Sequence, residues 1–141
     1  MKKIIIINGP NLNLLGKRQP EIYGTQTFEA YFKELEDRFP DINLFYFQSN
    51  HEGALIDKLH KVGFHFDGII INAGGYTHTS IALMDAISSI ETPVVEVHIS
   101  NIYEREDFRH ISYIEKVSAK SIVGKGLEGY AMAIDFFEKG N

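Results

Sequence analysis

Short apolar segments alternate with longer amphipathic segments along this chain, and that alternation restricts its possible folds more than any other feature. The apolar segments are residues 3–8, 43–47, 68–72, 94–98 and 119–123, and the amphipathic ones are residues 27–38, 52–62, 79–90 and 126–138. A run of β-branched residues, such as the four isoleucines at positions 4–7, is typical of a strand covered on both faces. The alternation predicts a three-layer α/β fold with a five-stranded parallel sheet, and right-handed crossovers favour the strand order 2-1-3-4-5.

Length and charge narrow the classes of partner. The 141 residues suffice for one domain with a substantial core, so we expect a single domain spanning residues 1–141. The net charge of −5 disfavours binding to nucleic acid and to anionic membranes. Any anionic ligand must therefore be held by a local cationic cluster, for which Arg18, Arg105 and Arg109 are candidates.

The chain contains no cysteine, which excludes disulfides, thiolate metal sites and a cysteine nucleophile. The apolar run after Met1-Lys2-Lys3 stops after four residues, short of the roughly 7–15 of a signal peptide. No segment approaches the ~20 apolar residues of a membrane span. We expect a cytoplasmic protein without a membrane partner.

Polar residues gather where three of the predicted strands end. In the predicted order, the first, third and fourth strands are neighbours, so their carboxyl ends meet at one edge of the sheet, where ligands of such folds bind. The residues concerned are Asn8, Asn11, Arg18 and Tyr23 after the first strand, Asn72, Gly74, Gly75 and His78 after the third, and Glu96, His98, Ser100 and Asn101 at the fourth.

Glu96 and His98 lie two residues apart, so a strand points both side chains to the same face. A carboxylate that accepts a hydrogen bond from the imidazole would select its tautomer and favour the imidazolium. The pair is either functional or a structural pair at the edge of the sheet, and its position favours function.

Tyr23 and Arg18 lie five residues apart in the loop after the first strand. A phenol with a pKa near 10 becomes a base at neutral pH only if its anion is stabilised, by roughly 4 kcal/mol for about three pKa units. A nearby guanidinium could supply this, but spacing alone favours a packed loop tyrosine over a catalytic one.

The segment from Asn72 to Ser80 ends a strand and leads into a helix. Gly74 and Gly75 permit close backbone approach, and the amides at the helix start suit an anion. His78 at this entrance is either a ligand contact or a surface residue near the helix cap.

The predicted helix 79–90 has apolar residues on two sides. Its main apolar face is formed by Leu83, Ala86, Ile87 and Ile90, whereas Ile81, Met84 and Asp85 point the other way. This second face indicates a contact with another subunit, with scattered surface hydrophobes as the alternative.

Arg105 and Arg109 lie four residues apart in a charged stretch, of which residues 103–107 are predicted as a short helix or a loop. Ion pairs with Glu104, Glu106 and Asp107 on a solvated face are one interpretation. The other is that Arg109 reaches the end of the fourth strand and binds substrate oxygens.

These motifs together resemble the type II 3-dehydroquinate dehydratase (type II dehydroquinase) family over essentially the whole chain. The resemblance is carried by NGPNLNLLG at residues 8–16, Arg18, YG at 23–24, QSNHEG at 48–53, NAGGYTHTS at 72–80 and EVHISN at 96–101. It implies a flavodoxin-like fold and dehydration of 3-dehydroquinate to 3-dehydroshikimate without cofactor or metal. It also implies a homo-oligomer, usually a dodecamer built as a tetramer of trimers.

The resemblance assigns catalytic roles by matching position. Tyr23 would remove the C2 proton, with Arg18 stabilising its phenolate, and the loop of residues 14–23 would close over the substrate. Asn11 would hold a water on the enolate. His98, oriented by Glu96, would be the general acid for loss of the C1 hydroxyl.

The resemblance also assigns binding roles. Asn72 and the backbone amides of Ile99 and Ser100 would bind the carboxylate. Three side chains would contact ring hydroxyls, namely His78, Arg109 and, from the adjacent subunit, Asp85. The chain has Gln19 and Ala54 where the family commonly has Glu, which affects expected lid and surface contacts but no catalytic position.

The main alternative from the fold alone is a noncatalytic module. A phosphorylated receiver needs carboxylates where this chain has Asn8 and Asn72, and a flavin carrier needs a Ser/Thr-rich loop after the first strand, which residues 12–20 do not provide. Both alternatives are therefore disfavoured.

Overall fold

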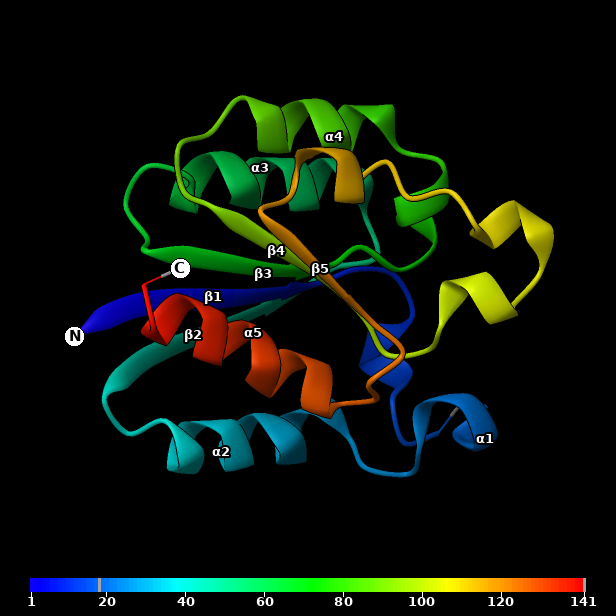
Figure 1. Ribbon diagram of the computed structural model, residues 1–141, viewed down its shortest axis with the longest axis horizontal. Coiled ribbons are helices and arrows are strands. Elements are labelled where there is room, and N and C mark those ends of the chain that lie inside the picture. Colours follow the sequence, from blue (N-terminus) through cyan, green and yellow to red (C-terminus); the bar gives the residue numbers. More distant parts are fainter. Residues whose placement is uncertain (18, 141) are drawn as a thin grey trace.

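A computed structural model describes residues 1–17 and 19–140, apart from the side chains of Ile22 and Tyr23. Within these residues, five parallel strands form one sheet in the order β2-β1-β3-β4-β5, which confirms the predicted topology (Figure 1). The strands are β1 (Lys2–Asn8), β2 (Ile42–Gln48), β3 (Gly68–Asn72), β4 (Val94–His98) and β5 (Lys120–Val123).

Helices cover both faces of this sheet. In Figure 1, α2 and α5 lie below the strands, and α3 and α4 lie above them. The α-helices are α1 (Pro20–Tyr23), α2 (Phe28–Arg38), α3 (Glu52–Val62), α4 (Ile81–Ser88) and α5 (Glu128–Glu138), and the short 3₁₀ turns are η1 (Leu12–Leu14), η2 (Gly74–His78), η3 (Ile102–Glu104), η4 (Asp107–Arg109) and η5 (Glu115–Val117).

The isoleucines of β1 supply the centre of two separate cores. Ile4 and Ile6 pack with residues of α2 and α5, whereas Ile5 and Ile7 pack with residues of α3 and α4. This division follows from the two-residue period of a strand, which turns alternate side chains to opposite faces. Burial on both faces explains why residues 4–7 of β1 are all isoleucine.

The observed elements differ from the predicted ones mainly at their ends. The helix predicted at 79–90 begins at Ile81, because Ser80 is its N-cap and accepts a hydrogen bond from the Leu83 amide at 2.9 Å. The charged segment after β4, predicted as a short helix or a loop, forms the two 3₁₀ turns η3 and η4. The loop predicted after β1 contains the single-turn helix α1.

Two further properties follow from the described coordinates. Across residues 1–17 and 19–140, no helix has the length and apolar character needed to cross a bilayer. In the same residues, no three His, Asp or Glu side chains gather in a way that could hold a metal ion.

Candidate active site

The ends of β1 and β3 share a buried hydrogen-bond network of neutral groups. Asn8 and Asn72 are partners in the strand register. Between their side chains, the Tyr130 hydroxyl donates to Oδ1 of Asn8 at 2.8 Å and accepts from Nδ2 of Asn72 at 3.0 Å. Burial raises the pKa of Tyr130, so this phenol stays uncharged. The network holds Asn72 at the floor of the site.

A second contact fixes which way the Asn72 amide faces. Its Oδ1 accepts a hydrogen bond from the Gly74 amide at 3.2 Å. Because Oδ1 and one Nδ2 hydrogen are thereby assigned, the remaining Nδ2 hydrogen is the donor that Asn72 can offer to a ligand. Asn72 lines the pocket described below.

Glycines bring the loops after β1 and β3 into direct contact. A Cβ at Gly9 would lie 2.5 Å from the carbonyl oxygen of Ala73, and Gly74 has a φ of 60° with its Cβ position 3.0 Å from the carbonyl oxygen of Pro10. Side chains at these positions would push the loops apart. The two glycines therefore set the width of the site at this wall.

Glu96 and His98 form a buried pair at the end of β4. Nε2 of His98 donates to Oε2 of Glu96 at 2.6 Å, and the two residues are 5% and 0% exposed. Burial by itself would raise the pKa of Glu96, but hydrogen bonds from His98, Ser112 and Ser121 bring it below its usual value. The carboxylate is thus ionised, and Nδ1 is the His98 nitrogen left for a ligand.

His78 lies beside this pair. Its ring stacks on that of His98, with centroids 6.4 Å apart and an interplanar angle of 18°. Nδ1 of His78 lies 2.8 Å from the carbonyl oxygen of Ile111, which can only accept, so Nδ1 carries the proton. Burial lowers the pKa of His78, so at neutral pH the ring is uncharged and Nε2 is an acceptor.

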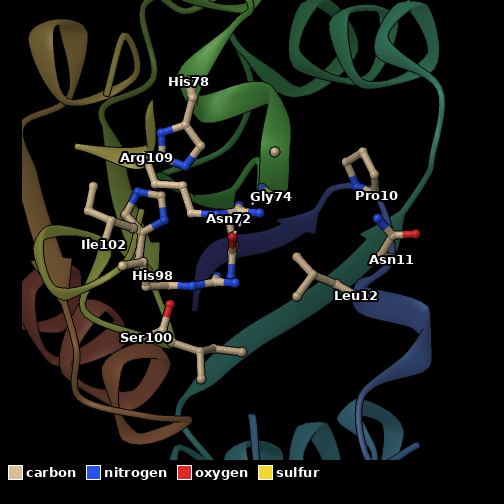
Figure 2. A pocket seen from close by; sticks show the side chains of 13 residues that line it. Pro10, Asn11, Leu12, Asn72, Gly74, His78, His98, Ser100, Ile102 and Arg109 are labelled. Carbon is tan, nitrogen blue, oxygen red and sulfur yellow. Dashed lines mark hydrogen bonds between the residues drawn. The ribbon is translucent and has the colours of Figure 1, made fainter. Parts of the chain in front are cut away.

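Arg109 makes an ion pair within the charged segment and also lines the pocket. Its Nε donates to Oε1 of Glu106 at 2.9 Å, as expected for a solvated ion pair. Arg109 also lines the pocket together with Arg105, and Figure 2 shows its side chain extending into it. This net acidic chain therefore has the local cluster of cations that an anionic ligand requires.

These groups surround one pocket at the carboxyl ends of the strands. Figure 2 shows His78, His98 and Arg109 on one side of it and Pro10, Asn11 and Leu12 on the other. The residues lining the pocket are Pro10, Asn11, Leu12, Asn72, Gly74, Gly75, His78, His98, Ile99, Ser100, Ile102, Arg105 and Arg109.

Most of the predicted site residues meet here. Seven of them line the pocket, namely Asn11, Asn72, His78, His98, Ile99, Ser100 and Arg109, and Glu96 lies directly behind His98. Asp85 is exposed on α4 and does not line this pocket. Arg18 lies outside the described residues. Tyr23 ends α1, and its side chain also lies outside the described part of the structure.

Three residues with clear structural roles escaped the sequence analysis. They are Tyr130, Ser112 and Ser121, which hold Asn72 or Glu96 from distant parts of the chain. Ser121 could have been found by pairing the predicted fourth and fifth strands, because Glu96 and Ser121 are register partners. Tyr130 and Ser112 carried no local signal.

The fold and this pocket define a flavodoxin-like α/β protein with a pocket of histidine, arginine and amide groups at the switch point of the sheet. Residues 2–138 match the family model described as Dehydroquinase class II. The chain is 53% identical over 137 residues to the 3-dehydroquinate dehydratase of Halothermothrix orenii, an alignment that covers 96% of this chain and 93% of that protein.

Solved structures give the same result. The crystal structure of type II dehydroquinase from Butyrivibrio crossotus is similar to this chain with a TM-score of 0.94 and 49% identity, over 97% of both chains. That of the enzyme from Propionibacterium acnes has a TM-score of 0.92 and 34% identity, covering 99% of this chain and 97% of the other. The chain therefore belongs to the class II dehydroquinase family.

Proposed function

We propose that this chain dehydrates 3-dehydroquinate to 3-dehydroshikimate in the shikimate pathway, acting as one catalytic domain without cofactor. Membership of the family supports the overall reaction. The observation that carries the proposal is the buried Glu96–His98 pair, with a 2.6 Å hydrogen bond, in a pocket lined by cations and amides. A hydro-lyase needs a proton donor for the departing hydroxyl, and an imidazolium supplies one at neutral pH.

The acid half of the mechanism is the role of His98. The imidazolium gives the proton on Nδ1 to the C1 hydroxyl, which leaves as water. The Nε2–H group keeps its hydrogen bond to the Glu96 carboxylate, so the ring keeps its orientation during the transfer. The carboxylate also stabilises the imidazolium before the proton leaves.

The base half belongs to Tyr23, with Arg18 as the cation that stabilises its phenolate. The phenolate removes the C2 proton and leaves an enolate. Asn11, which lines the pocket, holds the water that hydrogen-bonds to the enolate oxygen. Splitting the elimination into proton removal and loss of water lets each group act with a pKa suited to its own step.

Binding of the substrate uses the remaining pocket residues. Asn72 and the amides of Ile99 and Ser100 bind the carboxylate, and His78 and Arg109 bind ring hydroxyls. The exposure of Asp85 on α4 supports a role at the site of an adjacent subunit. The assembly that we propose is a homo-oligomer, a dodecamer built as a tetramer of trimers.

The reaction can be tested with purified protein. The product is a conjugated enone acid, so adding 3-dehydroquinate should produce a rise in ultraviolet absorbance. Tyr23→Phe should lower kcat by about 10²–10⁴-fold, the usual contribution of general acid–base catalysis. A matched control is Tyr103→Phe, which removes a half-exposed hydroxyl that donates to Glu115.

Two results would contradict the proposal. A wild-type protein that produces no absorbance at high enzyme concentration would exclude the reaction. Equal rates for Tyr23→Phe and Tyr103→Phe would retain the reaction and exclude Tyr23 as its base.

A further inference from the structure

Ser112 and Ser121, which have no part in the proposed mechanism, both direct their hydroxyl groups at the carboxylate of Glu96. Ser121 lies opposite Glu96 in the β4–β5 register and donates to its Oε1. Ser112, between η4 and η5, donates to Oε2 at 2.5 Å. The same oxygen accepts the hydrogen bond from Nε2 of His98. Since Glu96 is 0% exposed, these hydroxyls replace the water that would solvate an exposed carboxylate.

Ser112 also connects the pair to the segment that carries Arg109. Its Oγ accepts a hydrogen bond from the Glu115 amide at 3.0 Å, so the hydroxyl is held from both sides. The preceding residue, Ile111, accepts the hydrogen bond of His78 through its carbonyl. Movement of this segment would therefore disturb both histidines.

We propose that Ser112 and Ser121 are positioning residues that hold Glu96 as a carboxylate and thereby set the pH at which His98 gives up its proton. When His98 is an imidazolium, the adjacent cation already stabilises the carboxylate. Once His98 is neutral, the carboxylate is an isolated buried anion, and the serine hydroxyls matter more. They stabilise the deprotonated pair more than the protonated pair, and so make His98 the stronger acid.

Other ionisable groups that face this pair stay constant in the experiment below. His78 stacks on His98 from η2, and Arg105 and Arg109 line the same pocket. Tyr103 of η3, which donates to Glu115, also lies close enough to Glu96 for this carboxylate to help raise its pKa. Each keeps its identity in the serine variants. A changed titration of His98 then reports the loss of the serine hydroxyls.

The test follows the ring nitrogens of His98 by NMR as pH is varied, in the full chain without substrate. Loss of the signals in His98→Gln assigns them. Ser121→Ala should move the titration to higher pH by about one unit, and the Ser112→Ala, Ser121→Ala double variant should move it further. Ser118→Ala is the matched control, because the Ser118 hydroxyl donates to the Ile114 carbonyl, and should leave the titration unchanged.

Kinetics provide a second measurement, which rests on the proposed function. The alkaline limb of the pH profile of kcat should move in the same direction in Ser121→Ala, and kcat should fall about tenfold because His98 is a weaker acid. KM should change less than twofold, since the proposed mechanism gives neither serine a contact with substrate. Ser121→Thr, which keeps a hydroxyl, should restore both values.

The two measurements separate the two proposals. If the His98 titration is shifted in Ser121→Ala but the wild-type protein is inactive on 3-dehydroquinate, the proposed function is overturned and this inference is supported. An active enzyme whose His98 titration is unmoved in Ser121→Ala, or moves equally in Ser118→Ala, would overturn the inference. Because Ser112→Ala also removes an acceptor from the Glu115 amide, Ser121→Ala is decisive if Ser112→Ala does not fold.

Discussion

Two buried polar networks lie side by side at the carboxyl edge of the sheet, and they differ in charge. The amide network consists of Asn8, Asn72 and Tyr130, all neutral groups. The carboxylate network consists of Glu96, His98, Ser112 and Ser121, and contains an ionised carboxylate. Neighbouring strands β3 and β4 carry the two networks, with Ile71 and Glu96 as register partners.

The difference separates two requirements of the proposed mechanism. A neutral network can hold a binding group in place at any physiological pH, because none of its members gains or loses a proton. A charged network costs more to bury but can hold a transferable proton. We therefore expect mutations in the amide network to affect binding and stability, and mutations in the carboxylate network to affect turnover and pH dependence.

The largest expected effect is on turnover, at His98. His98→Gln keeps a polar side chain but removes the proton donor, and should lower kcat by about 10²–10⁴-fold. The initial rate of enone formation measures this. His60→Gln, at an exposed position on α3, is the matched control and should keep wild-type rates. Similar losses in both variants would show that the effect is general to histidine replacement.

The next largest effect is expected at Glu96. Glu96→Gln removes the charge that favours the imidazolium, and presents an amide donor to residues that are themselves donors. We expect kcat to fall by about a hundredfold, as for other groups that orient a functional histidine. If the carboxylate network acts on turnover and not on binding, KM of this variant should change much less than kcat. A variant with raised KM and unchanged kcat would place Glu96 in binding instead.

Tyr130→Phe tests the amide network. It removes the hydroxyl shared by Asn8 and Asn72, and should lower the free energy of unfolding by about 1–3 kcal/mol, measured in urea. KM should rise because Asn72 loses a contact that fixes its amide. The pH profile of kcat should stay in place. A displaced profile would mean that the two networks are electrostatically coupled.

The smallest effect is expected in the acid dependence of stability. The folded-state pKa of Glu96 is below the ordinary carboxyl value of 4.5. Glu96 therefore stabilises the folded state above pH 4.5, and this contribution is lost as the pH falls through the lower folded-state pKa. The measurement is the free energy of unfolding in urea at a series of pH values below 4.5. As the pH falls, this free energy should decrease more in wild type than in Glu96→Gln.

Tyr130→Phe is the contrasting variant for that measurement. Its difference from wild type in unfolding free energy should stay constant across the same acid range, because the raised pKa of Tyr130 keeps the phenol neutral. A difference that changes with pH in this variant, or one that stays constant in Glu96→Gln, would remove the distinction between the networks.

The fold was predictable from local patterns in the chain. The spacing of apolar residues within each segment indicates whether that segment is a strand or a helix. Few topologies accommodate five parallel strands with right-handed connections. The predicted edge of the site followed, because polar residues interrupt otherwise apolar strands at Asn8, Asn72 and Glu96. These features are local in sequence, and each was visible without knowledge of its neighbours in space.

Tertiary structure decided how those polar groups are satisfied. Tyr130 is 122 residues from Asn8 but donates to its side chain, and Ser121 reaches Glu96 across the β4–β5 pair. A tyrosine or a serine has many possible partners, and no local period indicates which distant one it meets. Polar residues thus mark the site within the sequence, whereas their partners depend on the packing of strands and helices in three dimensions.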